Sequence, residues 1–470
     1  MSLTPERLRE AAAVAPSPRQ LAWQQMEFYG FIHFGMNTFT GREWGDGTAS
    51  PALFDPACLD AGQWAQALKS AGMRGMILTC KHHDGFCLWP SAHTDYSVKY
   101  APWKGGRGDV VREAAEACRR AGLKFGVYLS PWDRHDPRYG AGKPYDDYYV
   151  AQLTELLTGY GELFCVWLDG ACGEGPNGRR QAYDWARYYE TIRALQPGAV
   201  ISVCGPDVRW CGNEAGHCRP SEWSVVPAQL QDAAYTAERS QQADDAGFAR
   251  RVSREDEDLG SREAIAHAGR LAWYPAEVDT SIRPGWFYHP EEDAQIRTPQ
   301  ELLDIYLAAV GGNAALLLNV PPAPDGRIAA PDCAALAGLG RKLEALFAED
   351  LTGRAALTAD SCAPDHPPAL AADGELGTCW QAAPGRTEAA LTFTFPQPET
   401  VSCLVLGEYL PLGQHIEAGC IEADGRPVAS FTVVGHKRIC RFTPVTAQRL
   451  TVRITAARAE PALRLAAAYR

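Results

Sequence analysis

The sequence lacks the features that would place a protein in or across a membrane. No apolar run approaches the roughly 20 residues that a helix needs to cross a bilayer. Residues 1–10 (MSLTPERLRE) lack the apolar core of an export signal. We therefore expect a soluble protein with no membrane partner. The expected location is the cytoplasm, and the alternative is a secreted or periplasmic protein from which a precursor segment has been removed.

An excess of basic residues is also missing. The chain has 45 Lys and Arg against 57 Asp and Glu, which gives a net charge of −12. Binding to a polyanion requires a basic stripe, and none is present. We therefore expect no nucleic acid partner.

Cysteine is present but is not arranged as a disulfide framework. The 15 cysteines are an odd number spread over the whole length, so we interpret them as reduced thiols. The one cluster that could hold a metal is Cys211, His217 and Cys218, and its spacing fits no zinc pattern. We predict no metal site and no cofactor.

The dominant pattern is an alternation of buried strands and helices. With 470 residues, 46% of them apolar, the chain can form one large and one smaller domain. About eight strands fit with helices between them, which predicts a (β/α)₈ barrel with an irregular sixth and seventh unit. The strands are expected at residues 29–35, 75–80, 124–130, 162–170, 199–204, 221–225, 270–275 and 313–320. The helices are expected at residues 60–73, 109–121, 145–159, 181–195, 299–310 and 333–349.

The composition changes after residue 351. From residue 357 onward there is no helical periodicity, and short alternating runs such as residues 390–395 (ALTFTF) are separated by turn residues. Regularly spaced short strands are typical of a β-sandwich. We therefore predict a barrel domain at residues 1–350 and a sandwich domain at residues 351–470.

The fourth predicted strand carries the strongest candidate for chemistry. Residues 162–170 (ELFCVWLDG) form an apolar run that stops at Asp169 and Gly170. Catalytic groups of barrel enzymes lie at the carboxyl ends of the strands, which is where Asp169 falls. The alternative is an aspartate that only caps the following turn.

Other polar and aromatic residues follow the predicted strands. They would converge on one mouth that is rich in donors, acids and aromatic faces, and sugars require this mixture for their hydroxyls and their apolar ring face. The polar members are His33, His82, His83, Tyr128, Asp169 and the groups near residues 204–222. The tryptophans in segments that would border the mouth are Trp44, Trp132, Trp210, Trp223 and Trp286, of which we expect two or three to touch a ligand.

A series of motifs resembles the α-L-fucosidases of glycoside hydrolase family 29. They are residues 31–39 (FIHFGMNTF), 43–45 (EWG), 81–86 (KHHDGF), 167–170 (WLDG) and 285–289 (GWFYH). The resemblance covers residues 21–322 and continues through residues 407–414 (GEYLPLGQ). It implies the same barrel fold that the strand pattern predicts.

The resemblance also implies a retaining hydrolysis with two carboxyl groups. Asp169 matches the family's nucleophile, and residues 209–216 (RWCGNEAG) are similar to the segment that carries the acid/base in the subgroup specific for branched α-1,3/1,4-fucosides. We therefore select Glu214 as acid/base. The rival residues are Glu174, Glu222 and Glu277, and an exposed glutamate without a role is the remaining interpretation of Glu214.

For the fucose pocket, the resemblance implies a set of aromatic, histidine and glutamate side chains. Adjacent histidines point to opposite sides of a strand, so both can reach a sugar only where the strand has become a loop. A metal site is the competing interpretation of the run from His82 to Asp84, and a buried core residue is the competing one for Trp286. The implied residues are His33, Glu43, Trp44, His82, His83, Tyr128 and Trp286.

These observations lead to one functional expectation with three alternatives. We expect a retaining exo-α-L-fucosidase that removes α-1,3/1,4-linked fucose from branched, Lewis-type oligosaccharides. The alternatives are a fucosidase of broad linkage specificity, a catalytically silent fucose-binding protein and a metal-dependent hydrolase.

Residues 373–380 (DGELGTCW) make the second domain similar to discoidin-like, galactose-binding modules, and we expect it to support the barrel rather than bind sugar. Residues 134–144 and 225–268 match no family motif, and residues 250–257 are predicted to form a solvated loop.

Overall fold

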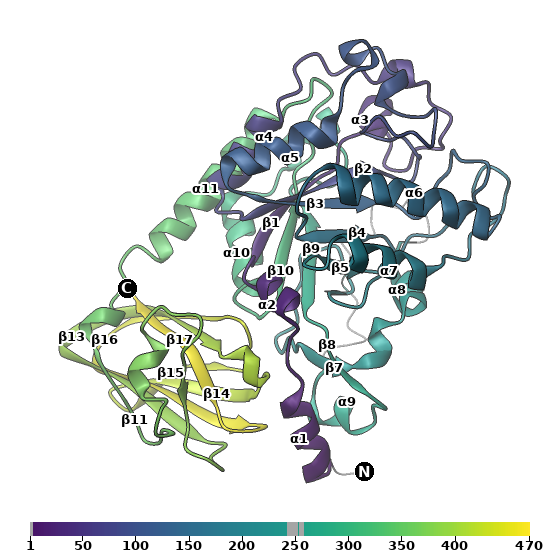
Figure 1. Cartoon of the computed structure of the whole chain (residues 1–470). Coiled ribbons are helices and arrows are strands. Elements are labelled where there is room, and N and C mark those ends of the chain that lie inside the picture. The colour runs from purple at the N-terminus through teal and green to yellow at the C-terminus, as the bar shows by residue number, and fades with distance from the viewer. Residues whose placement is uncertain (1–2, 242–251, 253–257) are drawn as a thin grey trace.

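The computed structural model describes residues 3–241, 252 and 258–470 (Figure 1). Eight parallel strands form one sheet in the order β5-β4-β3-β2-β1-β10-β9-β6. A parallel bridge between Ser202 and Val208 links the two edge strands, so the sheet forms a nearly closed barrel, as predicted. The strands are β1 (Phe28–Ile32), β2 (Gly75–Lys81), β3 (Lys124–Leu129), β4 (Cys165–Leu168), β5 (Val200–Val203), β6 (Arg209–Trp210), β9 (Ala276–Ser281) and β10 (Ala315–Asn319).

Helices cover the outside of the barrel (Figure 1). In α5, Asp109 accepts the backbone N–H of Arg112 at 2.8 Å, and Gly122 ends the helix with φ +73°. The covering helices are α4 (Ala61–Ser70), α5 (Val110–Ala121), α6 (Lys143–Gly159), α7 (Trp185–Leu195), α10 (Pro299–Ala309) and α11 (Ala330–Leu346). The shorter helices are α1 (Pro5–Ala13), α2 (Pro18–Gln24), α3 (Met36–Thr40), α8 (Ala233–Arg239) and α9 (Arg262–Ala266). None of the helices in the described part of the chain is long and apolar enough to cross a membrane.

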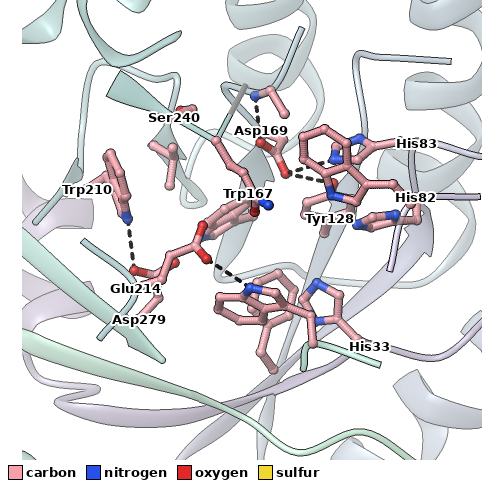
Figure 2. Close-up of a pocket in the computed structure, with 16 residues that line it drawn as sticks. His33, His82, His83, Tyr128, Trp167, Asp169, Trp210, Glu214, Ser240 and Asp279 are labelled. Carbon is pink, nitrogen blue, oxygen red and sulfur yellow. Dashed lines mark hydrogen bonds and ion pairs between the residues drawn. The ribbon is translucent and has the colours of Figure 1, made fainter. Parts of the chain in front are cut away.

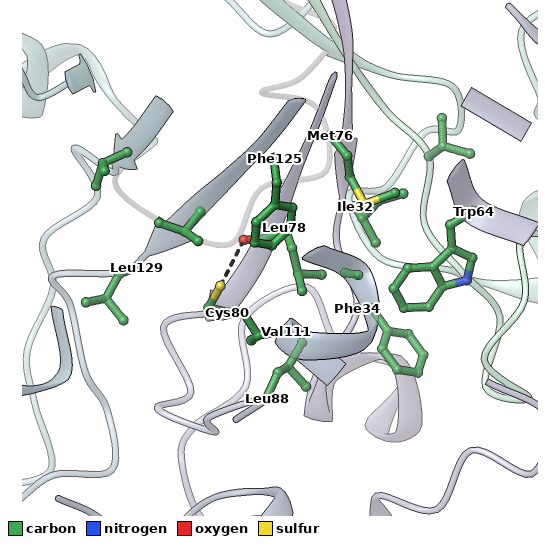
Figure 3. Packing of buried hydrophobic residues seen from close by; sticks show 14 of the residues in the cluster. Ile32, Phe34, Trp64, Met76, Leu78, Cys80, Leu88, Val111, Phe125 and Leu129 are labelled. Atoms are coloured by element: carbon green, nitrogen blue, oxygen red, sulfur yellow. Dashed lines mark hydrogen bonds between the residues drawn. The ribbon is translucent and has the colours of Figure 1, made fainter. Parts of the chain in front are cut away.

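The alternation of side chains along each strand creates two cores. Met76, Leu78 and Cys80 of β2 point outward and pack with α4 and α5 (Figure 3), whereas Ile77 belongs to the cluster inside the barrel. In β1, a Cβ at Gly30 would lie 2.6 Å from the side chain of Leu68 in α4. The missing side chain at this position therefore lets α4 approach the sheet closely.

The sixth and seventh barrel strands differ from the prediction. Residues 221–225 and 270–275 were expected in the barrel, but β7 (Val225–Pro227) and β8 (Leu271–Trp273) pair with each other as a separate antiparallel sheet. The barrel strands are instead β6, which is only two residues long, and β9. Acidic residues at Glu277 and Asp279 interrupt the apolar pattern of β9, which is why the sequence did not identify it.

The C-terminal region forms an antiparallel β-sandwich with its own core. Its two longest strands each run for 20 residues and pair with each other through two register shifts. The strands are β11 (Ala356–Ala359), β12 (Trp380–Gln381), β13 (Ala389–Glu408), β14 (Ile416–Ala423), β15 (Arg426–Phe431), β16 (Arg438–Ala457) and β17 (Ala462–Tyr469). The fold class predicted from the sequence is therefore confirmed.

The sandwich contacts the barrel through buried polar groups. His436 lies 3.0 Å from the carboxylate of Glu27, which also accepts Lys437 Nζ at 2.6 Å. The amide of Asn313 accepts the backbone N–H of His436 at 2.6 Å and donates to the carbonyl of Glu222 at 2.7 Å. Because these groups are buried and paired, the contact holds the two domains in one relative position.

Candidate functional site

The carboxyl ends of the barrel strands enclose a pocket (Figure 2). The pocket encloses about 540 Å³ of space, part of which is open to solvent. Most of the side chains predicted to be catalytic or fucose-binding line this pocket. These are His33, Trp44, His82, His83, Tyr128, Asp169, Glu214 and Trp286.

Asp169 is the first residue after β4 and extends into the pocket. Tyr128 Oη donates to its Oδ2 at 2.8 Å, and the backbone N–H of Ala171 donates to its Oδ1 at 2.8 Å. The side chain is 19% exposed, so it is open to the pocket rather than closed off by its partners. The two donors fix the orientation of the carboxylate toward the pocket.

Glu214 follows β6 and extends into the same pocket as Asp169 (Figure 2). The indole Nε1 of Trp286 donates to its Oε2 at 2.9 Å. Withdrawal from water raises the pKa of Glu214 to about 8, and the charges of Asp169 and Glu43 act in the same direction. At neutral pH the side chain therefore holds a proton that it can donate.

The rival glutamates lie elsewhere. Glu174 is exposed, and its backbone carbonyl accepts the indole of Trp132. Glu222 is buried in ion pairs with Arg209 and Arg219 outside the pocket. Glu277 lies inside the barrel and is not among the pocket-lining residues. None of the three faces Asp169 across the pocket.

His83 presents a hydrogen-bond acceptor beside Asp169. Ser130 Oγ donates to the carbonyl of Trp132 at 2.6 Å, so it accepts from His83 Nδ1 at 2.8 Å. This assigns the proton to Nδ1 and leaves Nε2 as an acceptor, 3.8 Å from Asp169 Oδ2. Burial lowers the pKa of His83 to about 4 despite the opposing charge of Asp169, so the ring is neutral at pH 7.

His33 also presents an acceptor. The side-chain amide of Asn319 donates to the carbonyl of Trp286 at 2.8 Å, which orients its Oδ1 toward His33 Nδ1 at 2.8 Å. His33 Nδ1 therefore donates, and Nε2 is free of a proton. Burial lowers the pKa of His33 to about 3, which keeps the ring neutral.

His82 has the opposite tautomer. Asn37 Nδ2 donates to the carbonyl of Glu43 at 2.8 Å and to His82 Nδ1 at 3.3 Å, so His82 carries its proton on Nε2. Burial and the neighbouring histidines hold the pKa of His82 well below its ordinary value. One neutral donor and two neutral acceptors suit the hydroxyls of a sugar.

Glu43 lies behind Trp286 and is not among the pocket-lining residues. Its carboxylate accepts the backbone N–H groups of Trp286 at 2.8 Å and Phe287 at 3.1 Å, and it lies 2.8 Å from His289 Nε2. These contacts fix the segment that carries Trp286. The geometry therefore gives Glu43 a role in positioning this segment.

The tryptophans divide into pocket and core residues. Trp44, Trp210 and Trp286 line the pocket, and Trp132 packs behind it with its ring centroid 5.2 Å from that of Trp44. The expectation that Trp223 borders the mouth is wrong, because Trp223 is buried in a cluster that includes Val433 of the sandwich. Trp223 precedes β7, which lies outside the barrel.

The sequence missed several pocket residues, of which Asp279 is the most important. Asp279 lies on β9 and accepts the indole N–H of Trp210 at 2.9 Å. Alternation along residues 276–281 would have revealed it, since Glu277 and Asp279 share one face. The other missed residues that line the pocket are Phe31, Trp167, Ala171, Val203, Ser240 and Gln241.

Two further predictions concern metals and the charged loop. Within residues 3–241, 252 and 258–470, no group of three or more His, Cys, Asp or Glu side chains is placed to hold a metal, and this includes Cys211, His217 and Cys218. The predicted solvated loop at 250–257 lies outside the described residues except for Val252.

A barrel with two carboxyl groups, neutral histidines and indole rings around one pocket defines a sugar-cleaving hydrolase. Comparison with known proteins identifies the family. Residues 17–346 match the family model described as alpha-L-fucosidase. The chain is 40% identical over 461 residues to "Alpha-L-fucosidase 1" of Arabidopsis thaliana, covering 95% of this chain and 85% of the relative. The chain therefore belongs to the α-L-fucosidase family of glycoside hydrolases, family 29.

Solved structures agree with this assignment. A glycoside hydrolase 29 family member from an unknown rumen bacterium is 36% identical with a TM-score of 0.78, covering 97% of this chain and 77% of the other. A family 29 fucosidase from Ruminococcus gnavus in complex with fucose is 27% identical with a TM-score of 0.84, covering 97% and 95%. The likeness extends over the barrel and the sandwich.

Proposed function

We propose that this protein is a retaining exo-α-L-fucosidase that releases α-1,3/1,4-linked fucose from branched, Lewis-type oligosaccharides. The observation that carries the proposal is the pair formed by Asp169 and Glu214, which line one pocket in different environments. Asp169 accepts hydrogen bonds on both of its carboxylate oxygens, whereas the raised pKa of Glu214 keeps that side chain protonated. A nucleophile and a general acid require this difference.

In the first step, an Asp169 carboxylate oxygen attacks the anomeric carbon of fucose from the face opposite the leaving oxygen. The bond from the anomeric carbon to the leaving oxygen breaks, and Glu214 gives its proton to that oxygen. The products are a fucosyl ester on Asp169 and the shortened oligosaccharide with a free hydroxyl. Tyr128 donates a hydrogen bond to Asp169 in the free enzyme and orients its carboxylate.

In the second step, the Glu214 carboxylate takes a proton from water, and the water oxygen attacks the anomeric carbon of the ester. Asp169 leaves as a carboxylate, and fucose is released with its original anomeric configuration. The acceptor atoms of His33 and His83 and the donor of His82 would bind the fucose hydroxyls. The indole of Trp286 would pack against the apolar side of the ring.

Two observations support the substrate class. The structure from Ruminococcus gnavus contains fucose and shares this fold. Residues 209–216 (RWCGNEAG), which carry Glu214, are similar to the acid/base segment of the subgroup that cleaves branched α-1,3/1,4-fucosides. A fucosidase of broad specificity would cleave simple aryl fucosides at least as well as a Lewis trisaccharide.

The test is fucose release from a Lewis-type trisaccharide, compared with an aryl fucoside and an α-1,2-linked fucoside. NMR of the initial product should detect the α-anomer. Asp169→Ala and Glu214→Ala should each lower kcat/KM, the former by about 10⁴-fold or more. A β-anomer as first product would contradict the retaining mechanism, and equal turnover of all linkages would contradict the specificity.

Azide separates the two roles. Without the nucleophile, azide can replace Asp169 in a single displacement and give a β-fucosyl azide. Without the acid/base, azide can attack the fucosyl ester and give an α-fucosyl azide. The same anomer from both variants would overturn the assignment. Fucose binding without hydrolysis of any fucoside would favour a silent binding protein.

A further inference from the structure

Three carboxyl groups in the barrel each accept a hydrogen bond from a tryptophan indole. Trp167 Nε1 donates to Glu277 at 2.7 Å, Trp210 Nε1 to Asp279 at 2.9 Å, and Trp286 Nε1 to Glu214 at 2.9 Å. The proposed mechanism uses only Glu214. Glu277 and Asp279 are two residues apart on β9, so their side chains share the inner face of the barrel.

The two acids on β9 differ in their number of donors. Glu277 accepts from the indole of Trp167 and also from the hydroxyls of Tyr29 and Ser202. These three donors lower the pKa of Glu277, but burial outweighs them, so its pKa still lies above the ordinary value. Asp279 is 2% exposed and accepts one side-chain hydrogen bond, from Trp210, among the described residues. One neutral donor does not compensate for a buried charge, so a neutral carboxylic acid is the stable form at this position.

The electrostatic surroundings of Asp279 point in the same direction. The titratable groups that act on it are Glu214 from the loop after β6 and Glu277 from its own strand, while Cys211 interacts with it from the end of β6. All three are neutral or negative. Burial holds the pKa of Asp279 well above its ordinary value, and the negative charge that Glu214 or Glu277 carries when ionised acts in the same direction. The guanidinium of Arg297 lies nearby, where it donates to Thr280 Oγ1 at 3.1 Å and to the carbonyl of Ala215 at 3.4 Å, the residues next to Asp279 and Glu214.

Asp279 also has the position needed to act on Glu214. Both side chains line the pocket, and Figure 2 shows them on the same side of it. Because Oδ1 of Asp279 accepts from Trp210, the proton of a neutral Asp279 belongs on Oδ2. The O–H group at Oδ2 is therefore the one that can donate a hydrogen bond to Glu214.

We propose that Asp279 is a positioning residue that stays protonated and uses its carboxylic O–H to stabilise the Glu214 carboxylate formed after proton donation. The proposal rests on the proposed role of Glu214 as acid/base. When Glu214 has given its proton to the leaving oxygen, it carries a new negative charge on a side chain that is withdrawn from water. An ionised Asp279 would repel that charge, whereas the O–H of a neutral Asp279 can donate to it while keeping its own proton. Asp279 thereby makes proton donation easier and holds the Glu214 carboxylate ready to activate water.

The test compares Asp279→Asn with Asp279→Ala. Asparagine is neutral at every pH and keeps both an acceptor for Trp210 and a donor toward the pocket, whereas alanine has neither. We expect Asp279→Asn to keep kcat/KM for an aryl fucoside within about 3-fold, with the alkaline limb of its pH profile unmoved. We expect Asp279→Ala to lower kcat by about 10- to 100-fold with a smaller effect on KM, because a hydrogen bond to a charged group is lost. Thermal unfolding of both variants identifies any loss of fold.

Two outcomes would overturn the proposal. If Asp279→Asn moves the alkaline limb to lower pH by about one unit or more, Asp279 is ionised and acts by repulsion. If Asp279→Ala matches the native protein in kcat, Asp279 has no role in the reaction.

A second measurement does not depend on activity. In Glu214→Gln, infrared spectroscopy at pH 7 should detect the C=O band of a buried carboxylic acid, and this band should disappear in the double variant with Asp279→Asn. Absence of the band would overturn the proposal even if one of the alanine variants failed to fold. If the native protein hydrolyses no fucoside but the band is present, the proposed function fails while the protonation of Asp279 stands.

Discussion

Two glutamates withdrawn from water, one at each end of the barrel domain, have opposite pKa shifts. Glu27 lies at the contact with the sandwich and is 7% exposed, and Glu214 lies in the pocket. Burial alone would raise the pKa of both side chains. The pKa of Glu27 is nevertheless held well below its ordinary value by the hydrogen bond from His436 and the charge of Lys437. The pKa of Glu214 rises to about 8.

The difference comes from the neighbours. Glu27 faces Lys437, His436 and Arg74, whereas Glu214 faces the indole of Trp286 and the acids Asp169 and Glu43. A carboxylate paired with cations stabilises the fold, and one left among acids keeps a proton for chemistry. Burial therefore does not decide whether an acid is structural or catalytic. The charges around it do.

In the comparison of these two glutamates, the largest effect should come from removing the proton of Glu214. Glu214→Gln keeps the shape and a hydrogen-bonding group but has no proton to give, so kcat/KM for a Lewis trisaccharide should fall by about 10²- to 10⁴-fold. The free energy of unfolding should change little. Steady-state kinetics and urea denaturation measure the two quantities.

The matched control is Glu174→Gln, since Glu174 is the exposed rival in the loop after β4. Its activity should stay within about twofold of the native value, because surface substitutions have small effects. If Glu174→Gln and Glu214→Gln lost kcat/KM to a similar extent, the proposed difference between a pocket glutamate and a surface glutamate would be wrong.

The same substitution at the domain contact should act on stability instead. Glu27→Gln leaves Lys437 and His436 without their buried carboxylate and should lower the free energy of unfolding by about 3–5 kcal/mol at pH 7. Because folding lowers the pKa of Glu27, its contribution is present above the ordinary glutamate pKa of 4.5 and declines as the pH falls below that value. Urea denaturation at pH 7 and at pH 4 checks both the size and the sign.

Glu162→Gln provides the comparison for a surface ion pair. Glu162 is 83% exposed and lies 3.8 Å from Lys124, so its loss should cost no more than about 1 kcal/mol. If Glu27→Gln were as stable as the native protein, the claim that Glu27 stabilises the fold would be wrong.

Apart from the two control substitutions, the smallest effect should follow from changing the indole that faces Glu214. Trp286→Phe keeps an aromatic face but removes the N–H donor, which lowers the pKa of Glu214 in the native protein. We expect kcat/KM to fall by about 10-fold and the alkaline limb of the pH profile to move to higher pH. The pH dependence of hydrolysis of an aryl fucoside measures the shift. An alkaline limb that moves to lower pH would contradict the assignment of this hydrogen bond.

The barrel was predictable because most of its strands are buried on both faces. Residues 75–80 and 313–320 read as continuous apolar runs, and the polar residue after such a run marks the carboxyl end where the pocket forms. The sixth and seventh strands were not predictable in this way. β6 has two residues, and β9 carries Glu277 and Asp279 where an apolar residue is usual. An acid inside a barrel is stable only with partners from other strands, and no local pattern reveals those partners.

By itself, the sequence determined the fold class, the placement of Asp169 after the fourth strand and the family resemblance, because these depend on local periodicity and on motifs. The tertiary structure decided which acids share a pocket, which tautomer each histidine adopts and how the charges of distant segments shift each pKa. Glu43 and Asp279 illustrate the division. Glu43 was predicted to bind fucose, and in the structure its carboxylate accepts the backbone N–H of Trp286. Asp279 was not predicted, and it lies on the same side of the pocket as Glu214. Hydrogen bonds and electrostatic interactions depend on distance in space, and distance in space is set only when the strands assemble into the barrel.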